Sequence, residues 1–243
     1  MDDSLTARQT QILKAVIDEY IETANPVGSE SLEKKYNLGV SPATIRNEMA
    51  YLIKKGYLKQ THTSSGRSPT PKGMKFYIDQ LMEEKELSVT DEVKAKEKIW
   101  DAREDLDNLF ERATKALSAH TNSLAIGTVA EHNKIWHSGY SKVFANPEFS
   151  DLLVCESLFA LLEEMDRLKN LLFEQEFSDP VDVLFGEELG WQNLEPVSIV
   201  ASRFKVDNKK AAFAVVGPTR IQYYTVIPTI RYFTNLVQEI AQS

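Results

Sequence analysis

The side chains with the most specific chemistry to offer lie in one short segment, from Ser41 to Asn47. The guanidinium of Arg46 can donate two hydrogen bonds to the edge of guanine, and the carboxamide of Asn47 can pair in the same bidentate way with adenine. The hydroxyls of Ser41 and Thr44 suit phosphate oxygens, which position a protein on DNA without reading its sequence. These residue types at this spacing indicate recognition of a DNA duplex rather than bond-breaking chemistry.

Groups that could support catalysis are scattered by comparison. None of the four histidines has further potential metal ligands at the spacing of a metal site; they are His62, His120, His132 and His137. The segment Gly217–Arg220 lacks the glycines and the lysine of a phosphate-binding loop, and we expect a turn there. Cys155 is flanked by leucines, so we expect a buried core thiol, and a single cysteine cannot form an internal disulfide. We therefore expect no enzyme, no cofactor and no metal.

Two earlier helices are expected to position this segment. Thr6 and Gln9 have capping-box spacing, and an apolar stripe follows them as far as Ala24. The sequence Asn-Pro-Val-Gly breaks this helix. A second, short helix is predicted from Ser29, as its cap, to Tyr36.

The third helix is predicted to begin with Ser41 as its cap and Pro42 at its first position, where the missing N–H costs nothing. At 100° per residue, its apolar and polar side chains separate onto two faces. The apolar face holds Ile45, Met49, Leu52 and Ile53, and the opposite face holds Ala43, Asn47, Tyr51 and Lys54, flanked by Thr44 and Arg46.

A hairpin is predicted directly after this helix. Its strands are Tyr57–Gln60 and Ser68–Thr70, and its tip, residues 61–67, contains a Ser-Gly turn. Arg67 beside the tip is a candidate for a minor-groove or phosphate contact. Helices and hairpin in this order predict a winged helix-turn-helix, whose expected DNA-binding residues are Ser41, Ala43, Thr44, Arg46, Asn47, Tyr51, Lys54, Lys59, Ser65, Gly66 and Arg67.

The charge distribution agrees with this interpretation. The chain has a net charge of −8, but residues 1–80 carry 11 Lys/Arg against 9 Asp/Glu, net +2, and the remainder carries 17 against 27, net −10. Residues 41–75 hold seven basic residues and one acid, net +6. A local basic footprint on an acidic protein is what phosphate binding requires.

The rest of the chain predicts an α+β domain. One long helix is expected over residues 90–122, with apolar a and d positions from Ile99 to Leu117, and it can serve equally as a dimer seam or pack on its own domain. A buried strand is expected over 123–130 and an apolar helix over 152–173. Three further strands and a last helix complete the prediction, over 181–185, 197–204, 211–216 and 226–240.

Several segments together resemble the HrcA family, the bacterial heat-inducible transcription repressors. The resemblance is carried by PVGS, LGVSPATIRNEM and HTSSGRSPTPKG in the first third, and by GYSKVFANPEFSDL and VVGPTRIQYYTVI later. It implies that Ser41 to Asn47 form the recognition element, that Gly66-Arg67 belong to the wing, and that a GAF-like domain follows. It further implies a homodimer on an inverted-repeat operator of double-stranded DNA, control of heat-shock chaperone genes, and a chaperonin partner.

The chain departs from the family between Val129 and Ser138. Typical members are longer and have further strands and an inserted dimerisation domain there. We therefore expect a reduced GAF-like domain, with the helix around Ile99–Leu117 taking a larger part in pairing. The expected domains are 1–84 for DNA binding, 85–122 for the linking helix and 123–243 for sensing and dimerisation.

Two other functions stay open. The chain could be a ligand-responsive winged-helix regulator of other genes, or a small-molecule-binding or catalytic module with a non-functional winged helix. No apolar run approaches the ~20 residues that cross a bilayer, so we expect a cytoplasmic protein without membrane contact.

Overall fold

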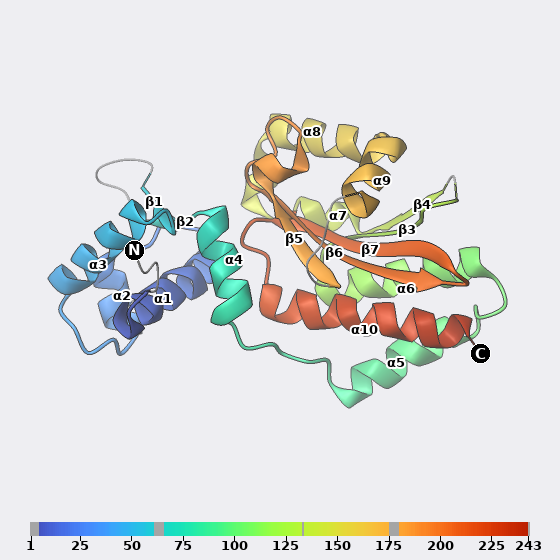
Figure 1. The fold of residues 1–243 in the computed structure, drawn as a ribbon, viewed down its shortest axis with the longest axis horizontal. Coiled ribbons are helices and arrows are strands. Elements are labelled where there is room, and N and C mark those ends of the chain that lie inside the picture. The colour runs from blue at the N-terminus through green and yellow to red at the C-terminus, as the bar shows by residue number, and fades with distance from the viewer. Residues whose placement is uncertain (1–4, 61–65, 133, 175–179, 243) are drawn as a thin grey trace. The chain divides into compact units, whose positions relative to one another are not determined.

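The computed structural model of the chain describes residues 5–60, 66–132, 134–174 and 180–242. They form two compact units, Met1–Glu83 and Glu84–Ser243, each with its own apolar core. Figure 1 shows both units with their helices and strands labelled.

The first unit has four helices and a short hairpin. Its elements in chain order are α1 (Ala7–Thr23), α2 (Ser29–Lys35), α3 (Pro42–Lys54), β1 (Leu58–Lys59), β2 (Ser68–Pro69) and α4 (Pro71–Gln80). The two strands are antiparallel, with Leu58 opposite Pro69. The core lies between α1, α2 and α3, where the apolar stripes of the helices meet.

Local signals set the helix ends in this unit. Thr6 and Gln9 form the expected capping box, since each side chain accepts a hydrogen bond from the other residue's backbone N–H. Ser41 caps α3 by accepting from the N–H of Thr44, with Pro42 in the first turn. The cap of α2 is Gly28 and not Ser29, because Ser29 already lies in the helix and is buried.

The second unit is built on a five-stranded antiparallel sheet with the strand order β4-β3-β7-β6-β5. The strands are β3 (Leu124–Val129), β4 (Ile135–Ser138), β5 (Val181–Phe185), β6 (Val197–Val206) and β7 (Lys209–Pro218). Asp207 and Asn208 both take positive φ in the two-residue turn between β6 and β7, as a twisted hairpin favours. The expected count of four strands was wrong, because the short β4 pairs with β3.

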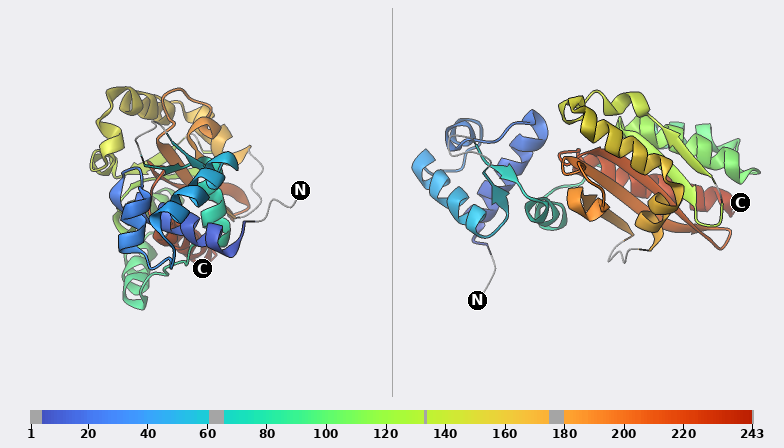
Figure 2. Two further views of the ribbon diagram at one scale, coloured as in Figure 1. Left: turned by 90° about the vertical axis from the view of Figure 1, so that its left-hand side faces the viewer. Right: turned by 90° about the horizontal axis from the view of Figure 1, so that it is seen from above.

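Helices cover both faces of this sheet (Figure 1; Figure 2). On one face lie α6 (Leu106–Thr121) and α10 (Tyr223–Ala241), with α5 (Val89–Trp100) against α6. On the other face lie α7 (Tyr140–Val143), η1 (Pro147–Ser150), α8 (Leu152–Glu163) and α9 (Met165–Phe173), and the single turn η2 (Gly186–Leu189) follows β5. The expected α+β class is thereby confirmed for this mixed architecture.

The expected single helix over 90–122 is two helices. The chain leaves α5 after Trp100, and Asp105 starts α6 by accepting a hydrogen bond from the N–H of Asp107. The apolar residues of α6, Leu109 and Phe110 among them, are buried in their own unit. The predicted helix 152–173 is likewise divided, at Glu164, whose ψ of 81° is not helical.

Candidate nucleic-acid interface

Helix α3 presents a polar face to solvent. Its apolar face is anchored on α1 and α2, since Ile45, Met49 and Leu52 are fully buried. The exposed positions are Ala43, Arg46, Asn47, Ala50, Tyr51 and Lys54. The predicted contact residues of this helix therefore share one solvent-facing surface, to which the structure adds Ala50, one turn after Asn47 and Arg46.

Two hydroxyl side chains lie at the start of α3. Ser41 and Thr44 lie within hydrogen-bond distance of each other through their hydroxyls, at 3.0 Å, and the N–H of Thr44 already donates to the Ser41 hydroxyl. Helix N-termini attract negative charge through their backbone N–H groups and the helix dipole. Ser41, a phosphate contact predicted from the sequence, is exposed at this end of α3, and Thr44 is half-buried there.

The one acidic residue of α3 is turned away from this surface. Glu48 accepts a hydrogen bond of 3.1 Å from the side-chain amide of Gln9 on α1, and both groups are partly buried. Among the residues of α3, the exposed ones therefore include the cations Arg46 and Lys54 and no carboxylate. The sequence did not predict this pairing because Gln9 and Glu48 are 39 residues apart.

The base of the hairpin holds the other candidates. Lys59 is exposed on β1, whereas Gly66 and Arg67 are half-buried. The backbone of Arg67 exchanges two hydrogen bonds with Val27, of 2.9 and 2.8 Å, and its side-chain Nε is buried without a hydrogen-bond partner among the described residues. Ser65, another candidate, lies outside the described residues, as do residues 61–64 of the predicted tip.

Lys72 is a further cation close to the hairpin, and we did not predict it as a contact residue from the sequence. It is exposed in the first turn of α4, where its Nζ donates to the carbonyl of Lys55 at 3.0 Å and lies 4.4 Å from the ring centre of Tyr57. The position of Lys72 in the first turn of a helix could have been recognised from the sequence, because Thr70 caps α4 and Pro71 starts it.

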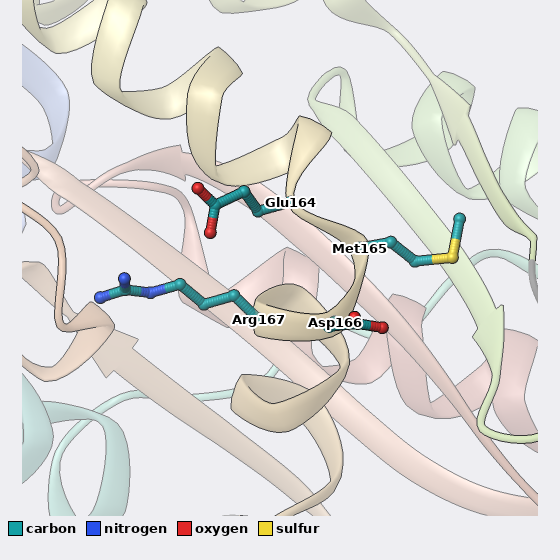
Figure 3. A pocket seen from close by; sticks show the side chains of 4 residues that line it. All are labelled: Glu164, Met165, Asp166 and Arg167. Carbon is teal, nitrogen blue, oxygen red and sulfur yellow. The ribbon is translucent and has the colours of Figure 1, made fainter.

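A surface depression lies on the second unit. It has a volume of about 450 Å³ and is lined by Glu164, Met165, Asp166 and Arg167. Figure 3 shows that Glu164 and Arg167 point to one side of the chain while Met165 and Asp166 point to the other, so the four do not converge. The guanidinium of Arg167 is already engaged, because it lies 4.5 Å from the ring centre of Trp191 and donates to the carbonyl of Gly190.

The remaining chemical candidates have structural roles. The Cys155 thiol is buried and donates to the carbonyl of Phe149 at 3.0 Å, and burial raises its pKa, so it is not poised to react. Arg220, from the predicted turn, pairs in bidentate fashion with Glu148, at 2.6 and 3.1 Å. Within the described ranges no three His, Cys, Asp or Glu side chains are grouped as metal ligands, and no helix is long and apolar enough to span a membrane.

Comparisons with known proteins connect this architecture to one family. A family model described as the HrcA protein C-terminal domain matches residues 67–227. A heat-inducible transcription repressor HrcA of Carboxydothermus hydrogenoformans is 26% identical over 333 aligned positions, covering 96% of this chain and 97% of that protein. The alignment is longer than the 243 residues of this chain, so the relative contains segments that this chain lacks.

Two further similarities agree. The HrcA repressor of Clostridium acetobutylicum is 41% identical over 149 residues, 61% of this chain and 43% of the relative. A crystal structure of a hypothetical protein has a TM-score of 0.76 at 16% identity, covering 98% of this chain and 99% of that one, which indicates a shared fold. The chain belongs to the HrcA family of heat-inducible transcription repressors, which is not a family of enzymes.

Proposed function

We propose that this protein represses transcription by binding operator DNA, and that its first unit is the winged helix-turn-helix that does so. The observation that carries the proposal is the exposed face of α3. The opposite, apolar face of this helix is buried in the core, and its one carboxylate, Glu48, accepts a hydrogen bond from Gln9. Side chains on a fixed helix read base edges more accurately than side chains on a mobile loop.

Each candidate residue has a role in this proposal. Arg46 and Asn47 read purine edges in the major groove, while Ser41 and Thr44 hold a phosphate at the start of α3. Lys59, Arg67 and Lys72 contact the flanking backbone, which the net charge of +6 over residues 41–75 supports. Tyr51 and Lys54, further along the exposed face, contact the sugar-phosphate backbone.

Family membership suggests the biological setting. Two copies of α3 would bind the halves of an inverted repeat, because the two-fold symmetry of a dimer matches that of a palindrome. The targets would be heat-shock chaperone genes, and the second unit would be a GAF-like domain that responds to a chaperonin in the cytoplasm. Heat-inducible repression is supported by the similarity to HrcA repressors, and the operator and the chaperonin are our inference.

The deciding experiment is a salt titration of the full chain on two duplexes of equal length. One carries the inverted repeat that precedes the chaperone genes, and the other is a scrambled version. The proposal expects at least a thousandfold preference for the operator, of the order typical for specific DNA binding, with affinity falling steeply as salt rises. Equal, weak binding to both duplexes would contradict it.

A further inference from the structure

The hairpin of the first unit is fixed to the loop between α1 and α2 by direct backbone pairing. The N–H of Val27 donates to the carbonyl of Arg67 at 2.9 Å, and the N–H of Arg67 donates back to the carbonyl of Val27 at 2.8 Å. Val27 itself is only 3% exposed, so its side chain is part of the core. The second strand of the hairpin is thus joined to a rigid part of the unit where it emerges from the tip.

Gly66 makes this pairing possible. A Cβ atom at this position would lie 2.5 Å from both the carbonyl carbon and the carbonyl oxygen of Pro26, and 2.6 Å from the N atom of Val27. All three are backbone atoms, which cannot rotate aside as the end of a side chain could. The need for glycine at this position follows from this close approach.

The other end of the same strand is fixed as well. The hydroxyl of Thr70 donates to the carbonyl of Gly56 at 2.6 Å, and the N–H of Thr70 donates to the carbonyl of Tyr57 at 3.1 Å. The loop that holds Gly66 leads directly into α2, which packs on α3. The hairpin therefore has a fixed position relative to α3 through the loop as well as through its direct connection at β1.

We propose that Gly66 and Val27 are positioning residues, which set the hairpin at the distance from α3 at which its cations reach the DNA backbone. This inference rests on the proposed function. It explains the backbone pairing of Val27 with Arg67, forty residues later in the chain. A side chain at position 66 would separate the hairpin from the loop and move Lys59 and Arg67 with it.

The test compares Gly66→Ala with Gly28→Ala in the full chain. Gly28 has a φ of −94°, and a Cβ there meets nothing within 4 Å, so the two variants differ in the contact that the new methyl group makes. Binding to the operator and to the scrambled duplex is measured across a range of salt concentrations.

The inference expects Gly66→Ala to bind both duplexes at least about 5- to 10-fold more weakly at 0.1 M salt, with a salt slope shallower by about one to two, as the loss of one or both of the phosphate contacts of Lys59 and Arg67 predicts. Its preference for the operator should stay close to that of the wild type, because α3 is untouched. Gly28→Ala should bind like the wild type. A Gly66→Ala variant that binds like Gly28→Ala would overturn the inference, and so would one that loses only the operator preference.

Hydrogen exchange in the wild-type chain provides a check that needs no variant. The amides of Val27 and Arg67 should be protected to the same degree as the interior amides of α3. Rapid exchange at these two amides would show that the hairpin is not fixed there and would overturn the inference. A wild type without operator preference would instead overturn the proposed function, and the role of Gly66 with it.

Discussion

At the scale of single residues, the most specific prediction concerns DNA binding by Arg46 and Asn47. Both are exposed on α3, and bidentate contacts of this kind discriminate between bases. We expect Arg46→Ala or Asn47→Ala to cost about 1–3 kcal/mol of binding free energy on the operator and much less on scrambled DNA. Competition binding with both duplexes measures the difference. Equal losses on the two duplexes for Asn47→Ala would remove its base-reading role.

Lys59 is the matched contrast to these two residues. It is exposed on β1, beside the phosphate backbone in the proposed complex. Lys59→Ala should weaken binding to both duplexes by similar factors and reduce the salt slope by about one. A loss confined to the operator would show that Lys59 reads bases.

His137 gives a prediction about pH. Its Nε2 is buried with no hydrogen-bond partner in the described part of the chain, and burial lowers the pKa of the ring. The unfolded chain, with an ordinary histidine pKa of about 6.5, therefore binds more protons than the folded chain below that pH. We expect the free energy of unfolding of the second unit to fall as the pH drops below about 6.5.

Tryptophan fluorescence during urea unfolding measures this quantity selectively, because Trp100, Trp136 and Trp191 all lie in the second unit. His137→Gln should reduce the loss of stability between pH 7.5 and 5.5. A part of the loss should persist, because burial also lowers the pKa of His120. An unchanged pH dependence in His137→Gln would mean that the buried ring is not its source.

At the scale of elements, the sequence predicted the ends of helices and strands correctly where they depend on residues close together in the chain. The sequence predicted the capped start of α1, the capped start of α3 with Pro42, and β5 with its bounds, because each depends on neighbours within a few residues. The break between α5 and α6 was not predicted, because apolar residues continue in helical register from Ile99 through Leu109 across it. Tertiary packing and the cap at Asp105 decide where the chain turns.

At Gly73, the helix propensity of α4 favours alanine, whereas the packing of α4 against the hairpin requires glycine. Alanine favours a helix over glycine by roughly 1 kcal/mol, so Gly73→Ala in α4 would stabilise an isolated helix. In this unit a Cβ at Gly73 would overlap the backbone carbonyl oxygen of Tyr57, where the hairpin begins. We expect Gly73→Ala to destabilise the first unit by about 1–3 kcal/mol, as overpacking does.

Far-UV circular dichroism follows this change, while tryptophan fluorescence, which reports on the second unit, should not shift. Gln80→Ala, at the exposed end of α4, is the control and should lie within about 0.5 kcal/mol of the wild type. A Gly73→Ala variant more stable than the wild type would mean that α4 and the hairpin are not in contact as described.

At the scale of the whole molecule, the sequence predicted the division of charge and the exposed face of α3, since both follow from composition and helical periodicity. It did not predict whether the apolar seam between Ile99 and Leu117 faces a second copy or its own sheet. Both arrangements need the same a and d pattern. The structure buries Ile99 and Leu117 inside the second unit, both at 0% exposure, so these residues pack on their own unit. The expectation that this part of the chain takes a larger part in pairing stays a prediction.

Leu109→Ala distinguishes a seam that is buried within one copy from a seam that lies between two copies. Leu109 is 1% exposed in the core of the second unit, whereas Val93 on α5 is 51% exposed. Leu109→Ala should lower the free energy of unfolding by about 2–5 kcal/mol through the cavity it leaves, and Val93→Ala by less than about 0.5 kcal/mol. Because the seam is internal, sedimentation should find the same oligomeric state for Leu109→Ala and the wild type across a hundredfold range of protein concentration. Dissociation of Leu109→Ala at an unchanged unfolding free energy would place the seam between two copies, and the operator-binding dimer would then depend on α6.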